Sequence, residues 1–414
     1  MASKFQAPRG TFDILPEQAR GRRRLEAAAA TVFARAGYEP IATPAFEDTD
    51  LFERGVGKST DIVRKEMFTF EDKGGRSLTL RPEGTASVCR AYLEHGMQKL
   101  AQPVKLFYLG PFFRHERPQA GRYRQFHQLG VECIGSDSPL ADAEVIMLLS
   151  DLLSELGVPG VELRLGSLGS FEARRAYLED LKAHLHAHEG KLSKDVRERI
   201  DINPLRAFDS DDEGTREVMA SAPTIVGQLE GEDAEHFAEV RALLDTAGIS
   251  YVIDPTLVRG LDYYTRTIFS FVCDRLGAQS EIGGGGRYDG LVEQLGGAPT
   301  PAVGFAAGIE RILLALDEEV AGEGRDAFVA VADPGQIRRA AALAAELRHA
   351  GISTELDLAG RSFKSQLKHA NRIGARRVLI LEADGSAQLR NMETGEQRPV
   401  DPGNLVDEMT GGEA

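Results

Sequence analysis

Two strand-like segments joined by an arginine-rich loop constrain the fold of this chain more than any other feature. Residues 104–113 (VKLFYLGPFF) and 123–134 (YRQFHQLGVECI) are rich in aromatic and β-branched residues, and the loop between them is polar. This order predicts a long antiparallel hairpin. Further strands are expected at 161–166, 266–273 and 280–283, so the hairpin would belong to a larger sheet.

Helical patterns flank these segments. Apolar residues recur at helical spacing over 17–36, and a second helix is predicted over 140–156, with Ser138 able to cap its first turn. Residues 38–44 between the first helix and the hairpin are interpreted as a strand closed by proline. The polar stretch 170–250 is predicted to be a mainly helical insertion into the sheet domain.

One more helix is predicted to begin near Gly304 and to run to about Asp317. After it the composition turns small and polar, and 414 residues exceed what one hydrophobic core usually holds. We therefore predict a boundary at Ala321 to Arg325, which divides the chain into domains 1–324 and 325–414.

The second domain alternates strands and helices. The predicted strands are 327–332, 352–356, 377–381 and 387–391, and the predicted helices are 334–349 and 362–373. This alternation predicts an α/β domain with right-handed crossovers.

A stripe of basic residues marks the last predicted helix. Arg361, Lys364, Lys368 and Arg372 follow one another at three or four positions, which places them on one helix face, and no acidic residue occurs between 361 and 377. A stripe of one sign suits a phosphate backbone. The alternative, a solvated face that happens to lack acids, is left open by the pattern alone.

Charge and cysteine content narrow the function classes. The net charge of −15 argues against a protein that binds nucleic acid over its whole surface, although a local basic face remains compatible with it. The three cysteines form no CxxC pair, which predicts neither a disulfide framework nor a zinc site.

No apolar run reaches the ~18 residues of a membrane span, and the first residues lack a signal sequence. We expect a cytoplasmic protein.

The hairpin carries the strongest candidate site. Because alternate residues of a strand share a face, Phe126, Gln128, Gly130 and Glu132 should line one surface, with Arg114 entering from the paired strand. A guanidinium there can hold a phosphate and a carboxylate together. The alternative is a polar hairpin exposed to water, which the apolar neighbours of Gln128 and Glu132 disfavour.

Three other segments carry chemistry of lower specificity. Leu80 to Thr85 offers the carboxylate of Glu83 and the hydroxyl of Thr85, but a capping turn before an 86–95 helix is an equal interpretation. Arg259 to Thr267 contains two adjacent tyrosines, which suit either a pocket or an ordinary core. Gly283 to Leu291 permits close approach of the backbone to a ligand, with a flexible turn as the alternative.

The last segment, Gly304 to Leu314, places small residues before Arg311, which can reach an anion; a surface Glu-Arg pair is the alternative. Taken in order, these segments resemble the histidyl branch of the class II aminoacyl-tRNA synthetase family over nearly the whole chain. The hairpin 113–126 is similar to class motif 2, and 304–314 is similar to motif 3, with Ala306 where the family often has glycine. The helix and strand that end at Pro44 resemble motif 1, the dimer-forming element.

The resemblance implies a fold and a reaction. The fold would be an α+β catalytic domain with an antiparallel six-stranded sheet flanked by helices, a helical insertion near the tRNA acceptor stem, and a C-terminal α/β anticodon-binding domain. The reaction would be ATP-dependent activation of L-histidine to histidyl-adenylate and its transfer to histidine tRNA. Mg²⁺ would bridge the outer phosphates, the protein ligands of the metal being unknown, and the enzyme would be a homodimer.

The resemblance also implies the site residues. Arg114 and Arg259 would be catalytic and would clamp the α-phosphate and the attacking carboxylate. The histidine-binding residues would be Glu83, Gly84, Thr85, Arg114, Gln128, Glu132, Arg259, Tyr263 and Tyr264. The ATP-binding residues would be Arg114, Glu116, Phe126 and Arg311. The basic stripe, Arg361, Lys364, Lys368 and Arg372, would contact tRNA.

Three other interpretations remain. The first is the regulatory subunit of ATP phosphoribosyltransferase, which resembles the catalytic core and senses histidine, but which usually lacks a C-terminal domain and departs from the arginine-bearing signature seen here at Arg259 to Tyr264. The second is a class II synthetase for another amino acid, which would not need Glu132, Tyr263 and Tyr264 arranged for an imidazole. The third is an RNA-binding protein with an inactive core, which the complete set of arginines argues against.

Overall fold

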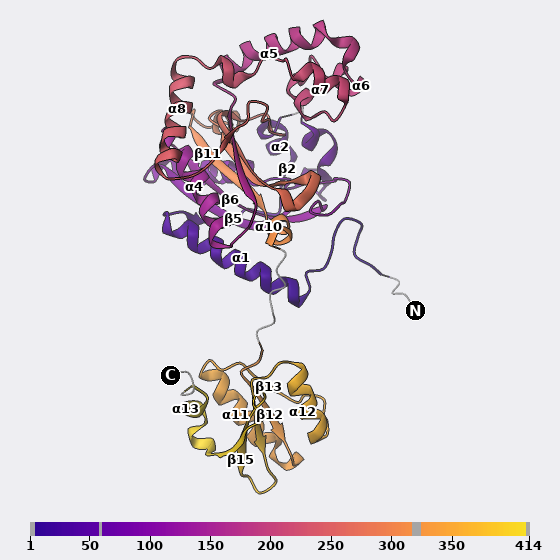
Figure 1. The fold of residues 1–414 in the computed structure, drawn as a ribbon, viewed down its shortest axis with the longest axis vertical. Helices are drawn as coiled ribbons and strands as arrows, with labels where there is room; N and C mark the ends of the chain where they lie inside the picture. The colour runs from indigo at the N-terminus through magenta and orange to yellow at the C-terminus, as the bar shows by residue number, and fades with distance from the viewer. Residues whose placement is uncertain (1–4, 58–59, 317–323, 411–414) are drawn as a thin grey trace. The chain divides into compact units, whose positions relative to one another are not determined.

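A computed structural model describes residues 5–57, 60–316 and 324–410. The chain forms two compact units, residues 1–320 and 321–414 (Figure 1). Most of the segment in which we predicted the boundary, Ala321 to Arg325, lies outside the described residues, as does the predicted helix end at Asp317.

The larger unit is organised around an eight-stranded sheet with the strand order β1-β5-β6-β11-β10-β9-β7-β8. The six central strands pair antiparallel throughout, and the two-residue edge strands β1 and β8 pair parallel to their neighbours. The strands are β1 (Glu39–Pro40), β5 (Val104–Phe113), β6 (Gln125–Ile134), β7 (Val161–Ser167), β8 (Val252–Ile253), β9 (Thr265–Cys273), β10 (Glu281–Arg287) and β11 (Ala302–Gly308). The predicted hairpin and the predicted antiparallel sheet are therefore confirmed.

Helices cover both faces of this sheet. Alternate residues of β5 face opposite ways: Phe107 joins the core under one set of helices, and Leu106 and Tyr108 join a second core on the other face. The first face is covered by α1 (Pro16–Arg35), α4 (Pro139–Glu155), α8 (Gly231–Thr246) and α10 (Ile309–Leu316), and the second by α3 (Thr85–Glu94) and α9 (Leu291–Gln294). The predicted cap of α4 is confirmed, since the Ser138 hydroxyl accepts the Leu140 N–H at 3.2 Å.

Smaller elements complete the edge of this unit. A three-stranded antiparallel sheet has the order β2-β4-β3, and α2 and a π-helical turn follow its first strand. These elements are β2 (Phe46–Asp48), α2 (Thr49–Gly55), the π-helical turn Ile62–Glu66, β3 (Phe68–Glu71), β4 (Ser77–Leu80) and the 3-10 turns Met97–Lys99 and Asp274–Gln279. Residues 38–44, predicted as one strand, form only the two-residue β1.

The helical insertion is divided between two cores. Its first part has a core of its own, which includes Tyr177, Leu181 and Val218. The last helix, α8, instead packs Phe237 and Val240 into the main core beside α4. The other elements of the insertion are α5 (Phe171–Ala187), α6 (Lys194–Arg197), α7 (Glu213–Met219) and the 3-10 turns Glu189–Lys191, Pro204–Asp209 and Ile225–Gln228.

One prediction about a glycine-containing segment was wrong, and for a second segment the structure excludes the alternative interpretation. The helix expected to begin near Gly304 begins at Ile309, because residues 302–308 form β11, which is hydrogen-bonded to β6 on one side and to β10 on the other. The glycines at 283–286 do not form a flexible turn, because they lie inside β10. Pairing on both sides of these strands outweighs the weak local preference of small residues.

The smaller unit has a five-stranded sheet in the order β13-β12-β14-β15-β16, in which β12 pairs parallel to β13 and β14. Its elements are β12 (Ala327–Val331), the 3-10 turn Pro334–Gln336, α11 (Ile337–His349), β13 (Thr354–Leu356), α12 (Phe363–Arg372), β14 (Arg377–Leu381), β15 (Ala387–Asn391), β16 (Gln397–Val400), the 3-10 turn Pro402–Asn404 and α13 (Leu405–Thr410). The predicted α/β alternation is confirmed, and β16 and α13 are additions to it. Helices α11 and α12 pack on opposite faces, since Val329 and Phe328 of β12 belong to their separate cores.

Cys89, Cys133 and Cys273 are free and buried. Among the described residues, no helix combines the length and the apolar character that a membrane span requires.

Candidate active site

A cavity of about 650 Å³ opens beside the strands at the centre of the large sheet, a size typical of a small-molecule site. The hairpin, the turn before α3, the segment before β9, and strands β10 and β11 all contribute to its wall. Eleven of the twelve residues predicted to bind histidine or ATP line it: Glu83, Gly84, Thr85, Arg114, Glu116, Phe126, Gln128, Arg259, Tyr263, Tyr264 and Arg311. The exception is Glu132.

Arg259 is held in the cavity wall by an acidic partner. Its Nη1 donates to Glu281 Oε1 at 2.7 Å, its guanidinium lies 5.9 Å from the centre of the Tyr264 ring, and its Nε is buried with no partner among the described residues. Partial desolvation in the cavity wall acts to raise the pKa of Glu281, but the charge and the hydrogen bond of Arg259, together with the charges of Arg311 and Arg114, hold this pKa below its ordinary value. Glu281 thus occupies a position on Arg259 that a substrate carboxylate or phosphate can take.

Arg114 is aligned by the backbone of the neighbouring turn. Its Nε donates to the Pro82 carbonyl at 2.9 Å, and its guanidinium lies 5.4 Å from the centre of the Phe126 ring. Glu116 lies two residues after Arg114, in the loop between β5 and β6, and pairs with Arg122 at 3.1 Å. The hairpin therefore places the Phe126 ring, the Arg114 guanidinium and the Glu116 carboxylate at one end of the cavity.

Arg311 is oriented by two backbone carbonyls from different segments. Its Nε donates to Gly121 O at 3.1 Å, and its Nη1 donates to Glu281 O at 2.6 Å. Burial lowers the pKa of Arg311, but a guanidinium stays protonated at any physiological pH. The side chain is fixed between the hairpin loop and β10, so it presents its charge to the cavity without further reorganisation.

Glu83 caps α3 as well as lining the cavity. Its two carboxylate oxygens accept the N–H groups of Thr85 and Ala86 at 2.7 and 3.0 Å. Burial raises the pKa of Glu83, although these two backbone donors oppose the shift. The capping alternative for this turn is therefore correct for the local geometry, and it fixes the carboxylate at the cavity wall.

Glu132 lies behind the wall and is completely buried. It accepts a hydrogen bond from the Thr85 hydroxyl at 2.8 Å and a second from the Tyr288 hydroxyl. A side chain at Gly304, which lines the cavity, would collide with the Glu132 carboxylate. Burial raises the pKa of Glu132 to about 8. The carboxyl of Glu132 is thus separated from the cavity by the side chains of Thr85 and Tyr288 and by Gly304, which has no side chain.

Four buried polar atoms of residues that line the cavity have no hydrogen-bond partner among the described residues. They are Arg259 Nε, Glu116 Oε2, Gln128 Oε1 and the hydroxyl of Tyr108, of which Glu116 Oε2 has an ion pair with Arg122. A buried polar atom without a partner costs on the order of 1–3 kcal/mol, so native proteins rarely leave one unless a ligand or water completes it. These atoms indicate that the cavity receives a polar ligand.

Tyr108, Glu281 and Tyr288 are among the residues of this site to which no role was assigned from the sequence. The alternation within 104–113 places Tyr108 on the face of Leu106 and Phe112, but it could not show that this face borders a cavity. Tyr288 lay in a quoted segment, but its partner Glu132 is 156 positions away. Glu281 carried no recognisable pattern.

No group of three or more histidine, cysteine or acidic side chains in the described part of the chain is arranged to hold a metal ion. Three carboxylates of the cavity wall have partners: Glu281 pairs with Arg259, Glu116 with Arg122, and Glu310 with His127 at 2.8 Å.

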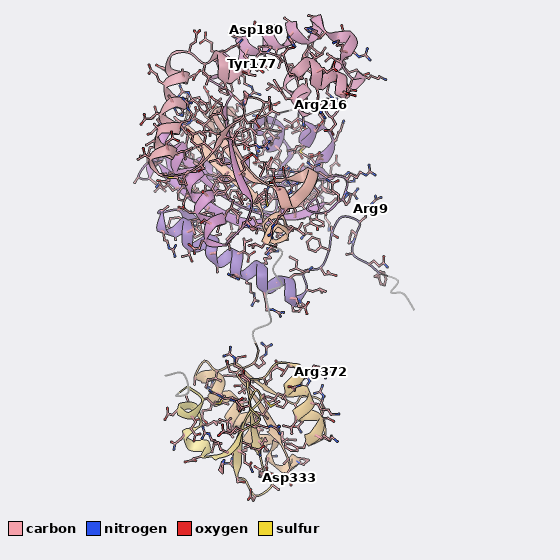
Figure 2. All side chains as sticks on the ribbon, in the orientation of Figure 1. Arg9, Tyr177, Asp180, Arg216, Asp333 and Arg372 are labelled. Atoms are coloured by element: carbon pink, nitrogen blue, oxygen red, sulfur yellow. The ribbon has the colours of Figure 1, made fainter. Side chains whose placement is uncertain are left out.

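Three residues of the basic stripe, Lys364, Lys368 and Arg372, lie on α12 of the smaller unit, and Arg361 precedes this helix; Figure 2 labels Arg372. Lys364, Lys368 and Arg372 are exposed, whereas Arg361 pairs with Asp357 at 2.5 Å. Residues of the opposite helix face, including Phe363, Leu367 and Ala370, pack on the sheet.

Comparisons with known proteins cover both units. The family model described as "Histidyl-tRNA synthetase" matches residues 10–312, and the model described as "Anticodon binding domain" matches residues 326–411. The histidine–tRNA ligase of Halothermothrix orenii is 49% identical over 98% of this chain and 98% of its own length. That of Anaeromyxobacter dehalogenans is 48% identical over 99% of this chain and 100% of its own.

Solved structures agree with these matches. A crystal structure of apo S. aureus histidyl-tRNA synthetase has a TM-score of 0.83 at 38% identity and covers 98% of this chain and 99% of that one. A structure described as an ATP phosphoribosyltransferase regulatory subunit/histidyl-tRNA synthetase from Bacillus halodurans has a TM-score of 0.69 at 25% identity, with coverage of 92% and 100%.

Proposed function

The chain belongs to the histidyl-tRNA synthetase family, and from this premise we propose that it forms histidyl-adenylate in the cavity and transfers histidine to the 3′ end of histidine tRNA. It is an enzyme of protein biosynthesis, an aminoacyl-tRNA ligase that uses ATP. The observation that carries the assignment to this cavity is the convergence of Arg114, Arg259 and Arg311, from three distant segments, on one space of ligand size.

The first step is an in-line displacement at phosphorus. A carboxylate oxygen of histidine forms a bond to the α-phosphorus of ATP, while the bond from that phosphorus to the oxygen bridging to the β-phosphate breaks, and pyrophosphate leaves with the electron pair. Negative charge grows on the α-phosphoryl oxygens, so the protein acts through positioning and fixed positive charge. Arg114 and Arg259 supply that charge, and Arg259 exchanges Glu281 for the substrate as it does so.

ATP is proposed to lie along the hairpin. Phe126 stacks on the adenine, Glu116 lies near its amino group, and Arg311 binds the γ-phosphate. The fixed orientation of Arg311 between two carbonyl oxygens supports its role, because a preset guanidinium loses little freedom on binding. Mg²⁺ is proposed to arrive with the nucleotide, and no step is assigned to a protein-bound metal.

Histidine is proposed to bind against the turn before α3. Glu83, Thr85 and Gln128 receive its ammonium group, and the partnerless Gln128 Oε1 supports this role. Glu132 and Tyr264 take the two imidazole nitrogens, with Tyr263 alongside and Gly84 leaving room for the backbone of the substrate. Glu132 reaches the imidazole once the Thr85 or Tyr288 hydroxyl that separates it from the cavity gives way. In the second step the terminal ribose hydroxyl of tRNA attacks the carbonyl carbon of the adenylate, and AMP leaves.

The experiment that tests this function is ATP–pyrophosphate exchange across the twenty amino acids, followed by charging of histidine tRNA. Exchange with histidine alone is the expected result. The alternative, a histidine-sensing regulatory subunit, predicts histidine binding without exchange. That alternative has no better support, because both units match synthetase family models over the whole chain.

We also propose that the basic stripe contacts tRNA. Reversing Lys364 and Lys368 to Glu is expected to raise the KM for tRNA by roughly tenfold or more and to make the dependence of log KM on log salt shallower by one to two units, because each lost phosphate contact removes about one from that slope. Charging kinetics at several salt concentrations measure both quantities.

Two controls accompany this measurement. Histidine-dependent exchange without tRNA is expected to stay unchanged in the double variant. Arg338→Glu places the same charge reversal on the exposed face of α11, across the sheet from the stripe, and is expected to change the KM for tRNA far less. An unchanged KM for tRNA in the double variant would remove the stripe from the tRNA-binding surface.

A homodimer and a cytoplasmic location complete the proposal. Phe46 and Phe70 expose 50% and 43% of their surface on the small sheet and contact each other with ring centres 6.2 Å apart, which is apolar area available for association. Sedimentation at micromolar concentration is expected to give about twice the 45.0 kDa of one chain. The cytoplasm is the compartment in which ATP and tRNA are available together.

A further inference from the structure

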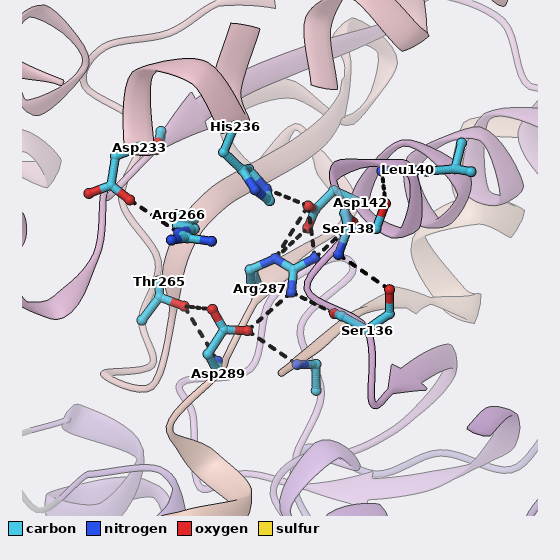
Figure 3. A network of polar contacts seen from close by, with 12 residues as sticks. Ser136, Ser138, Leu140, Asp142, Asp233, His236, Thr265, Arg266, Arg287 and Asp289 are labelled. Carbon is cyan, nitrogen blue, oxygen red and sulfur yellow. Dashed lines mark hydrogen bonds and ion pairs between the residues drawn. The ribbon is translucent and has the colours of Figure 1, made fainter. Parts of the chain in front are cut away.

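Arg287, at the end of β10, is completely buried and makes ion pairs or hydrogen bonds in several directions (Figure 3). Its Nε and Nη2 donate to the Asp142 carboxylate of α4 at 3.1 and 3.0 Å. Its Nη1 donates to Asp289 at 3.1 Å and to the Ser136 carbonyl at 2.8 Å. Every nitrogen of the guanidinium is engaged, so this end of β10 has one well-defined position.

Tyr288 directly follows the last residue of β10 and lines the active-site cavity, and its N–H donates to the Ala302 carbonyl of β11 at 2.8 Å. Successive side chains of an extended backbone leave opposite faces, so an anchor at Arg287 sets the position of the Tyr288 ring. That ring contacts Tyr263 at 5.7 Å between centres, and its hydroxyl donates to Glu132. The anchor behind the sheet therefore acts on the part of the wall assigned to the imidazole.

The anchor is extended by a residue of the insertion. His236 of α8 makes a 2.7 Å hydrogen bond through Nε2 to Asp142 Oδ2, and both side chains are buried (Figure 3). Asp142 thus receives Arg287 from β10 and His236 from α8. A buried carboxylate needs several donors to offset its desolvation, and His236 is one of them.

A second bridge leaves the same helix one turn earlier. Asp233 accepts Arg266 Nε at 3.1 Å and the Ser170 N–H at 2.8 Å. Arg266 has φ +45°, the only positive φ of a non-glycine among the described residues. Such a conformation is costly for a long side chain and persists only where its surroundings hold it. Arg266 follows Tyr264 by two positions, so the ion pair between Asp233 and Arg266 fixes the segment that carries Tyr263 and Tyr264.

We propose that Asp233 and His236 of α8 are positioning residues for the histidine pocket: His236 acts through Asp142 and Arg287 on Tyr288, and Asp233 acts through Arg266 on Tyr264. The inference rests on the proposed function, since it concerns the pocket for that substrate. Helix α8 belongs to the insertion in sequence but packs in the main core, so it joins the insertion to the amino-acid end of the cavity and leaves the ATP end to the hairpin.

The test compares His236→Leu with His236→Gln in histidine-dependent ATP–pyrophosphate exchange by the full-length enzyme, with rates normalised to active sites by titration. Leucine removes the donor while filling the space, whereas the glutamine amide can donate from nearly the same place. We expect the leucine variant to raise the KM for histidine by about tenfold and to leave the KM for ATP within about twofold, because small displacements of a binding group cost affinity for its own ligand. Glutamine should restore most of the loss.

Glu239→Leu, the same replacement on the exposed face of α8, is the matched control and should match the parent enzyme. An unchanged KM for histidine in His236→Leu, an equal rise in both KM values, or no rescue by glutamine would each overturn the proposal, because a purely structural role lowers the active fraction or the melting temperature instead. Asp233→Asn gives a second measurement if the leucine variant does not fold. Absence of exchange in the parent enzyme would instead reject the proposed function.

Discussion

Replacing Arg259 with alanine is expected to lower kcat for histidine-dependent ATP–pyrophosphate exchange by roughly two to three orders of magnitude, the usual effect of removing one preset donor to a developing charge. The guanidinium lies in the cavity wall, where Glu281 pairs with it. In water such a charge would be screened, but in this cavity it acts on the α-phosphoryl oxygens at close range. Stopped-flow or exchange kinetics at saturating substrates measure the change.

Arg259→Lys and Glu281→Gln make the interpretation specific. Lysine keeps the charge but loses the fork that can hold a phosphate and a carboxylate together, so an intermediate rate is expected. Glutamine removes the charge that competes with substrate for Arg259, so it should not lower kcat as alanine does. Glu281 is 42% exposed and stays solvated after Arg259 is removed, so all three variants should fold. A full adenylation rate in Arg259→Ala would disprove the clamp.

Replacing Glu132 with glutamine is expected to raise the KM for histidine by roughly a hundredfold or more and to leave the KM for ATP nearly unchanged. A site built to hydrogen-bond a substrate discriminates strongly, because its own buried polar groups are left unpaired when the match fails. Glutamine keeps an acceptor for Thr85 or Tyr288, whereas alanine would strand both hydroxyls at a cost of about 1–3 kcal/mol each.

Glu116→Gln is the crossed control. Glu116 lines the cavity beside Arg122, at the end where the adenine is proposed to bind, so this variant should raise the KM for ATP and spare the KM for histidine. The two glutamine variants thus test the orientation of both substrates at once. A normal KM for histidine in Glu132→Gln would refute the imidazole assignment.

The raised pKa of Glu132 adds a pH dependence with a definite sign. With a pKa of about 8 the carboxyl is protonated below that pH, and free imidazole gains its own proton below about pH 6.5. Below pH 6.5 the Glu132 carboxyl and the histidine imidazole each carry a proton, but the hydrogen bond between them holds only one. Binding of histidine must then release a proton, so the affinity should fall about tenfold for each unit by which the pH is lowered. Calorimetry in buffers of different ionisation enthalpy counts that proton, and Glu132→Gln should abolish its release. A carboxyl of ordinary pKa would instead bind imidazolium well down to about pH 4.5.

Sequence reasoning worked best where local and global preferences agree. Helix α4 has a serine cap, a proline in its first turn and an apolar face, and its limits match the prediction within one residue. The hairpin was recognisable because strand-forming residues and a polar loop specify the same structure. Eleven of twelve predicted ligand-binding residues share one cavity because they lie at strand ends and turns that converge on it.

The failures share a physical cause. Strand β11 was predicted as the start of a helix because Gly304 and Ala306 have no strong preference, and only pairing with β6 and β10 decides their conformation. The contact of Tyr288 with Glu132 and that of Glu281 with Arg259 likewise arise from register between strands distant in sequence. Contacts between residues on distant strands leave no local pattern in the sequence from which they could be predicted.

The placement of the insertion also shapes how the chain can fold. Strands β7 and β9 are antiparallel neighbours, and Ser167 pairs with Thr267 one hundred positions later. Bringing them together requires closing a long loop, which slows the search for a transition state. The first part of the insertion has a core of its own, centred on residues such as Leu181, so it can collapse as a local cooperative unit and shorten the effective loop. The same helices that interrupt the sheet would then speed its assembly.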